Sequence, residues 1–265
     1  MEVINGKLVM GNYSYDDDVY GPASVQAFDT RTGKKAWQFN INNDPGLAYS
    51  KSTNVAVGVV ENKVVAITNF GKVYILDDNG HKTNEFIAFR PVKHQDATIC
   101  TTVSRSGVGF NKDNIIIAPS KTEVKGASNY KAKTSVEHPD VGSVMVFDTD
   151  GNLKWKFRLG GQAMNVLVKG KYLLLGTSYN PDTMDYNYCG VYAFNLAQEA
   201  KETELNATEK NVLDSYIGYY HTDGAIIYDC LSASEDGRVI CANTWPTRVG
   251  TEKHGEHSLY MLRIK

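Results

Sequence analysis

The chain has 265 residues, of which 42% are apolar and 22% charged, and its formal net charge is −2. These values are typical of a globular protein with a sizeable core, and they exclude a nucleic-acid binder held by a basic face. No apolar run approaches the ~20 residues of a membrane-spanning helix, and the N-terminus lacks the basic and apolar segments of a secretory signal.

One sequence phrase returns along the chain. Its first copy is Ser24–Trp37, Ser-Val-Gln-Ala-Phe-Asp-Thr-Arg-Thr-Gly-Lys-Lys-Ala-Trp. A weaker copy covers Val73–Phe86, and a strong one covers Ser143–Trp155. Val191–Asn195 keeps only the first half, and Ser258–Arg263 is a final fragment. A repeat of this length predicts a repeat architecture.

Each repeat is predicted to form four short strands. In the second repeat these are Asn54–Val60, Val64–Asn69, Val73–Leu76 and a more polar strand that ends near Phe86. Short strands separated by turn residues predict an all-β fold. The one exception is 196–210, where a single helical turn is expected.

The second strands align the repeats, because they begin at Lys7, Lys63, Asn114, Lys171 and Arg238. This spacing of roughly 50–67 residues exceeds the ~40–50 of a minimal four-stranded blade, and the excess lies in loops. We therefore predict an all-β propeller of four-stranded antiparallel blades, with about five blades in one domain or segment, 1–265. The expected blades are 1–40, 52–87, 100–158, 162–205 and 224–265.

Four cysteines, Cys100, Cys189, Cys230 and Cys241, are too few and too scattered for a disulfide framework. Cys230 and Cys241 flank a predicted hairpin turn at 234–237. A two-residue loop there would place them opposite each other at a hydrogen-bonded position, which is awkward for a disulfide. We expect free thiols and keep a bridge between these two as the alternative.

The phrase Ala27–Lys34 followed by Trp37 resembles the repeat of the pyrroloquinoline-quinone-like (PQQ-like) propellers. That family includes quinoprotein alcohol dehydrogenases, the outer-membrane assembly lipoprotein and many cell-surface propellers. The resemblance implies that the Trp docks between neighbouring blades, while the Asp and Gly shape the preceding turn. The matching structural residues are Asp29, Gly33, Trp37, Asp148, Gly151 and Trp155. The second blade has Phe86 near the Trp position, and the fourth has Asn195 for the Asp and no Trp.

The resemblance also implies more blades, since family members commonly have seven or eight. One alternative is a segment of a larger propeller, with further blades of a longer parent chain as partners and a periplasmic or cell-surface location. The other is a free-standing five-blade ring in the cytoplasm. Both alternatives stand.

Connectivity predicts a loop-rich face, because the loops between second and third strands and those between blades share one end of the propeller. This face carries nearly every long insertion and most of the tyrosines. Tyr and Trp are enriched where proteins bind partners, although the same rings can serve to pin down long loops. The candidate ligand-binding residues are Tyr15, Tyr20, Tyr49, Arg90, His94, Tyr179, Tyr186, Tyr219, Tyr220, His221 and Trp245.

A metal or acid–base site is the weaker hypothesis for the same face. Its candidates are His221, Asp223, His254 and His257. Loop histidines without a metal-ligand spacing are mostly structural or solvent-exposed. Asp16–Asp18 lacks the spacing of a calcium loop and is predicted to be a solvated acidic loop.

We predict a non-catalytic binding or scaffold module whose Tyr-rich loop face binds a protein or glycan, and no nucleic acid. The alternative is a quinone-dependent oxidoreductase or metal-assisted hydrolase or lyase in the central depression of that face. A structural segment without a ligand is the third option. The dehydrogenases of the family have a vicinal Cys-Cys pair and a calcium site, and neither can be matched here. We therefore expect no cofactor, neither PQQ nor Ca.

Overall fold

The computed structural model describes residues 1–12, 23–42, 54–94, 97–125, 138–179, 186–198, 215–249 and 252–265. These residues are almost entirely β-structure. Their helices are two 3-10 turns, η1 (Arg105–Gly107) and η2 (Tyr186–Tyr188). The helical turn expected within 196–210 lies for the most part outside the described residues.

Five antiparallel sheets follow one another along the chain. Sheet 1 consists of β1 (Glu2–Ile4), β2 (Lys7–Asn12), β3 (Ser24–Asp29) and β4 (Lys35–Asn40). Sheet 2 consists of β5 (Asn54–Val60), β6 (Lys63–Thr68), β7 (Lys72–Leu76) and β8 (Lys82–Ile87). Sheet 3 consists of β11 (Val108–Phe110), β12 (Ile115–Ile117), β14 (Ser143–Phe147) and β15 (Leu153–Arg158). Sheet 4 consists of β16 (Ala163–Lys169), β17 (Tyr172–Thr177), β18 (Gly190–Asn195) and β19 (Tyr216–His221). Sheet 5 has three strands, β20 (Leu231–Ala233), β21 (Val239–Asn243) and β24 (Leu259–Arg263).

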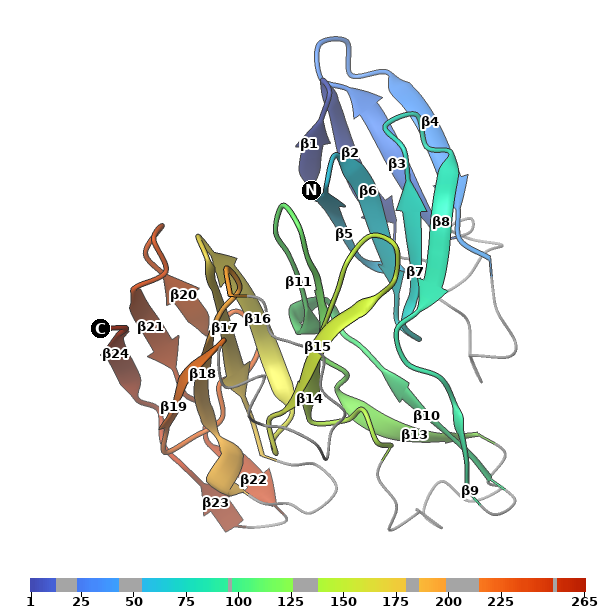
Figure 1. Cartoon of the computed structure of the whole chain (residues 1–265). Helices are drawn as coiled ribbons and strands as arrows, with labels where there is room; N and C mark the ends of the chain where they lie inside the picture. Colours follow the sequence, from blue (N-terminus) through green and yellow to red (C-terminus); the bar gives the residue numbers. More distant parts are fainter. Residues whose placement is uncertain are drawn as a thin grey trace.

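These sheets form an arc from sheet 1 to sheet 5, with the N- and C-termini at its opposite ends (Figure 1). Within each sheet the strands pair in sequence order. Four apolar clusters join sheet 1 to 2, 2 to 3, 3 to 4 and 4 to 5. The predicted all-β propeller of about five antiparallel blades is confirmed.

Two smaller sheets are present in addition to the five predicted blades. One contains β9 (Val92–His94), β10 (Ala97–Thr102) and β13 (Lys121–Lys125), and the other is the hairpin of β22 (Thr247–Val249) and β23 (Glu252–His254). Consequently sheet 3 begins at β11, after the predicted boundary at residue 100.

Sheet 4 extends past its predicted end at residue 205, because its fourth strand is β19. The sequence prediction left these residues outside the blades 162–205 and 224–265. The strand carries Tyr, Ile, Tyr and Tyr, which favour β-structure. It was missed because the repeat phrase stops at Asn195, so no Trp marked a fourth strand.

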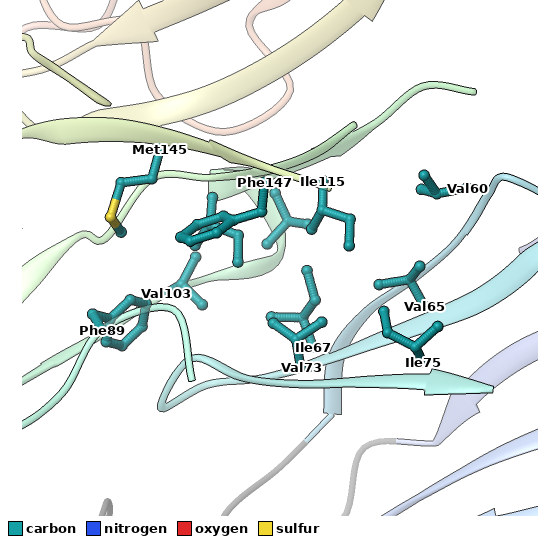
Figure 2. Close-up of a cluster of buried hydrophobic side chains, with 12 residues drawn as sticks. Val60, Val65, Ile67, Val73, Ile75, Phe89, Val103, Ile115, Met145 and Phe147 are labelled. Atoms are coloured by element: carbon teal, nitrogen blue, oxygen red, sulfur yellow. The ribbon is translucent and has the colours of Figure 1, made fainter. Parts of the chain in front are cut away.

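The core lies between the sheets. Figure 2 shows the cluster between sheets 2 and 3, where Val65, Ile67 and Ile75 face Ile115 and Phe147. Residues of this kind each stabilise the fold by roughly 1.5–3 kcal/mol when fully buried. The middle strands of sheets 2 to 4 therefore have apolar residues on both faces rather than an alternating pattern.

An Asp caps the turn between the third and fourth strands in three sheets. Asp29 Oδ1 accepts the N–H groups of Arg31 and Thr32 at 3.1 and 2.7 Å. Asp77 and Asp148 accept equivalent bonds in sheets 2 and 3. These bonds lower the pKa of Asp29, with the side chain of Thr32 as the largest cause. The capping carboxylates thus serve the fold.

Trp37 joins sheet 1 to the turn of sheet 2. Its Nε1–H donates to the carbonyl oxygen of Asp78 at 2.9 Å. Its ring covers Gly80, whose φ is +83° and where an added Cβ would lie 2.6 Å from the indole. A glycine is needed there for both reasons.

Sheet 2 contacts the turn of sheet 3 as sheet 1 contacts the turn of sheet 2, but two residues replace the single Trp. Asn84 occupies the register position of Trp37, and its Nδ2 donates to the carbonyl of Thr149 at 3.2 Å. Phe86, two residues later, covers Gly151, whose φ is +90°. Phe86 therefore fills the space of the Trp without taking its position. In sheet 3, Trp155 is buried against Phe194 of sheet 4.

Cys230 and Cys241 do not lie opposite each other, so the register of a two-residue loop is wrong and the alternative of a bridge is excluded. The β20–β21 register places Ser232 opposite Cys241, and the Asn243 N–H donates to the Cys230 carbonyl. The hairpin loop has four residues rather than two, because Ser234 bonds Val239 through both backbone and side chain. All four cysteines are free.

Candidate functional site

The second strands end and the third strands begin at one end of the arc. The β9–β10–β13 sheet and the β22–β23 hairpin are both at this end (Figure 1). The opposite end has tight turns, such as Asn5–Gly6 and Glu61–Asn62, whose residues all have positive φ. The loop-rich end therefore carries the two small sheets that are additional to the repeated blades.

Two tyrosines and a carboxylate form the first half of a surface cluster at this end. Tyr220, at the end of β19, is 49% exposed, and its ring meets that of Tyr260 edge-on at 5.9 Å. The Tyr260 hydroxyl donates to Asp223 Oδ2 at 2.7 Å and accepts the Asp223 N–H at 3.2 Å. This double contact fixes the Tyr260 ring against which Tyr220 rests.

Trp245 and His257 form the second half. Trp245 is also 49% exposed, and the His257 ring lies edge-on to it at 5.1 Å. The backbone of Trp245 exchanges two hydrogen bonds with Ala225, at 2.8 and 3.1 Å. Ala225 follows Asp223 by two residues, so one short segment connects both halves. We call Tyr220, Asp223, Trp245, His257 and Tyr260 the aromatic cluster.

Close backbone contacts hold this segment in place. An added Cβ at Gly224 would lie 3.0 Å from the carbonyls of Trp245 and Glu256. Gly255 has a φ of +77°, and a Cβ there would meet the Asp223 carbonyl at 2.1 Å. Thr244 Oγ1 donates to the Glu256 carbonyl and accepts the Ser258 N–H. The half-exposed rings therefore project from backbone that is fixed by several independent bonds.

Tyr219 serves the fold rather than the surface. Its hydroxyl donates to the Cys189 carbonyl at 2.7 Å, and its ring packs on Tyr192 at 4.4 Å. Burial raises the pKa of the Tyr219 phenol well above its usual range. Tyr219 is therefore a structural residue of sheet 4.

The remaining predicted ligand-binding residues are scattered. His221 is exposed, with its Nδ1 3.4 Å from the Tyr219 hydroxyl. Arg90 is exposed, and Tyr179 is half-buried. Tyr15, Tyr20 and Tyr49 lie outside the described residues, and only the backbone of His94 and Tyr186 is described.

The predicted metal candidates do not converge. In the part of the chain that the structure describes, no three His, Cys, Asp or Glu side chains are arranged to hold a metal ion. Asp223 bonds Tyr260, and the His257 ring contacts Trp245. Among the described residues no carboxylates are assembled into a metal site, and no two cysteines are adjacent in the sequence.

Sequence reasoning missed Tyr260 and His138. Tyr260 lies inside a strand copy of the repeat and gave no functional signal. His138 is fully buried, and its Nε2–H donates to the Arg90 carbonyl at 2.9 Å. Its backbone N–H donates to Thr122 Oγ1, and its Nδ1 accepts the Asp140 N–H. Burial lowers the pKa of His138, which favours the neutral ring required by these two bonds.

Comparison with known families supports the repeat assignment. Residues 3–86 match the family described as outer membrane protein assembly factor BamB. The matched residues cover sheets 1 and 2, which contain the first two copies of the repeat phrase. No curated protein sequence matches the chain.

Two solved structures share the propeller fold. Quinohemoprotein alcohol dehydrogenase ADHIIG from Pseudomonas putida HK5 is 13% identical, with a TM-score of 0.52 over 97% of this chain and 37% of that chain. Quinohemoprotein alcohol dehydrogenase from Comamonas testosteroni is 14% identical, with a TM-score of 0.55 over 91% of this chain and 38% of that chain. The chain thus spans little more than a third of either enzyme, and the likeness is one of fold. Among its described residues no helix has the length and apolar character needed to cross a membrane.

Proposed function

We propose that this PQQ-like propeller is a non-catalytic binding module, and that the aromatic cluster is the centre of its binding surface. The observation that carries the proposal is the pair of half-exposed rings, Tyr220 and Trp245, each braced by a second ring. Rigid aromatic side chains with a polar neighbour supply contact area at a low cost in conformational entropy, which is why such residues dominate interface energetics.

The partner is a protein or a glycan. Either would stack on the two exposed rings and meet the Asp223 carboxylate beside them. The matched family is described as an outer membrane protein assembly factor, which supports a protein partner and a location outside the cytoplasm. Cell fractionation with a tagged chain tests the location, and recovery only from the cytoplasm would contradict it.

The binding test compares the wild type with the double variant Tyr220→Ala/Trp245→Ala. Both chains are immobilised and probed with a fractionated extract of the source cells and, separately, with an array of defined glycans. We expect one reproducible partner whose capture falls at least tenfold in the double variant.

The matched control is Tyr228→Ala, which removes a tyrosine that is even more exposed than Tyr220 and lies outside the cluster. It should capture as much partner as the wild type. Tyr219 is left intact, because its replacement would disturb sheet 4. Equal capture by the double variant and the wild type would contradict the proposal, provided that thermal unfolding shows both to be folded.

A further inference from the structure

The two ends of the arc each present an apolar sheet face that the described residues leave uncovered. In sheet 5, Val239, Cys241, Leu259 and Met261 share one face by register, while Ile240, Ala242 and Leu262 on the other face pack on sheet 4. Leu259 is 64% exposed and Met261 67%. Ser232, Asn243 and Arg263 share this face by register, and its apolar part consists of Val239, Cys241, Leu259 and Met261. Exposed apolar residues gathered on one face are of the kind that marks an interaction site.

Sheet 1 presents its apolar face on the side that points away from sheet 2. Val3, Leu8 and Phe28 lie side by side by register, with Met10 next to them, while Ile4, Val9 and Ala27 face sheet 2. Val3 is 62% exposed. Sheets 2, 3 and 4 have no equivalent open face, because each of them packs on a sheet at both sides.

The internal interfaces show how one sheet recognises the next. Lys7 at the start of β2 approaches Asp78 in the third turn of sheet 2, with a Nζ–Oδ2 distance of 3.5 Å. Lys63 at the start of β6 donates to Thr149 Oγ1 in the third turn of sheet 3 at 3.0 Å. In sheets 1 and 2, a basic residue at the start of the second strand therefore meets the turn between the third and fourth strands of the following sheet.

Each end of the arc holds one half of that contact. Arg238 stands just before β21, as Lys7 and Lys63 begin β2 and β6, and among the described residues its charge acts on Asp236 of its own hairpin turn. Sheet 1 carries the turn Asp29–Gly33, whose Thr30 follows the capping Asp as Thr149 follows Asp148. An added Cβ at Gly33 would meet no atom within 4 Å, whereas Gly80 and Gly151 are covered by aromatic rings of the preceding sheet.

We propose that the sheet 5 face of one copy of this chain docks on the sheet 1 face of a second copy. The contact has the same arrangement as the interfaces between sheets within the chain. Apolar residues lie at its centre, and Arg238 of one copy lies against the Thr30 turn of the other. The two surfaces are different, so the association is head to tail and each copy has one donor and one acceptor face. This contact is separate from the aromatic cluster, and its outcome does not depend on the binding function.

Sedimentation velocity tests the proposal, because the monomer has a mass of 29.3 kDa. Between about 1 and 200 µM, a range in which weak interfaces associate, the average mass of the wild type should rise above that of the monomer. Met261→Glu blocks the sheet 5 face and Val3→Glu blocks the sheet 1 face. Each variant alone should remain monomeric, with association at least tenfold weaker than in the wild type.

An equimolar mixture of the two variants distinguishes this geometry from any symmetric one. Met261→Glu retains its sheet 1 face and Val3→Glu its sheet 5 face, so the mixture should form a 1:1 complex that grows no further. Met261→Leu keeps the surface apolar and should associate like the wild type. A wild type that stays monomeric at every concentration would overturn the proposal, as would a mixture in which the two variants do not pair.

Discussion

Sheets 2 and 5 contain nearly the same third strand in different surroundings. Val73–Leu76 reads Val-Tyr-Ile-Leu, and 259–262 reads Leu-Tyr-Met-Leu. The four residues of sheet 2 are buried, whereas Leu259 and Met261 are among the most exposed apolar side chains. In both strands the Tyr and the last Leu face the preceding sheet, so the strands have the same orientation.

This difference shows that a propeller strand is buried by its neighbours and not by its own sequence. Sheet 2 is covered by sheets 1 and 3 and has a fourth strand, β8. Among the described residues, sheet 5 is covered by sheet 4 alone, and no strand pairs with the second edge of β24. The same phrase therefore forms a core in one place and a docking face in the other.

The largest effect should come from truncating the equivalent side chains in the two strands. Ile75→Ala leaves a cavity between sheets 2 and 3 and should lower the free energy of unfolding by about 2–5 kcal/mol. Met261→Ala removes a solvent-exposed side chain and should change it by no more than about 0.5 kcal/mol. Urea denaturation of dilute protein measures both values. Equal losses would contradict the difference in burial.

The turn glycines test the docking contacts between sheets. Gly151→Ala introduces a methyl group into the Phe86 ring at a positive φ, and should destabilise the protein by about 2–3 kcal/mol. Gly33→Ala has the same conformational cost without a clash, and should lose about 1 kcal/mol. Thermal unfolding of the two variants gives the comparison, and a larger loss at Gly33 would contradict it.

Trp37→Phe isolates the polar part of the first interface. The change keeps most of the ring on Gly80 and removes the Nε1–H donor to the Asp78 carbonyl. We expect a loss of about 1 kcal/mol, the usual net value of one hydrogen bond. Gln38→Ala, an exposed change on the same strand, should have no measurable effect. Denaturant midpoints distinguish the two results.

The smallest expected effect is the contribution of His138 to the pH dependence of stability, which is absent at neutral pH. Its folded-state pKa lies below that of the unfolded chain, so the unfolded state binds the proton more readily. Stability should be full above the ordinary His pKa of about 6.5 and should decline as the pH falls below it. Asp140, 3.7 Å from Nδ1, favours protonation, while Lys156 opposes it.

His138→Gln removes the titration and retains an amide donor in place of the imidazole. Its unfolding free energy should therefore depend less on pH between about 5 and 6.5 than that of the wild type. Denaturation at several pH values in that range measures the slopes. Identical slopes would show that His138 makes no contribution to the pH dependence.

The repeat phrase predicted sheets 1 to 3 well, because its Asp, Gly and apolar residues determine local turns and strand faces. It could not predict the role of Asn84, whose amide bonds the turn of sheet 3 as the indole of Trp37 bonds the turn of sheet 2. It also gave no indication of β19, since that strand follows a long connection and carries none of the phrase.

The aromatic cluster was predictable only in part. Tyr220 and Trp245 were expected from their position in the loop-rich face, but the bond between Tyr260 and Asp223 joins residues 37 positions apart. No local pattern encodes such a contact. The same holds for the cysteines, because two extra loop residues changed the register of β20 and β21.

Peroxide oxidation of the methionines compares the closed and open regions in one experiment. Met145 is buried between sheets 2 and 3, and Met261 projects from sheet 5. In dilute protein Met261 should be oxidised at least tenfold faster than Met145, since oxidation of methionine follows exposure, and at high concentration it should become protected. Similar rates for the two methionines, or a Met261 rate that does not change with concentration, would contradict the account.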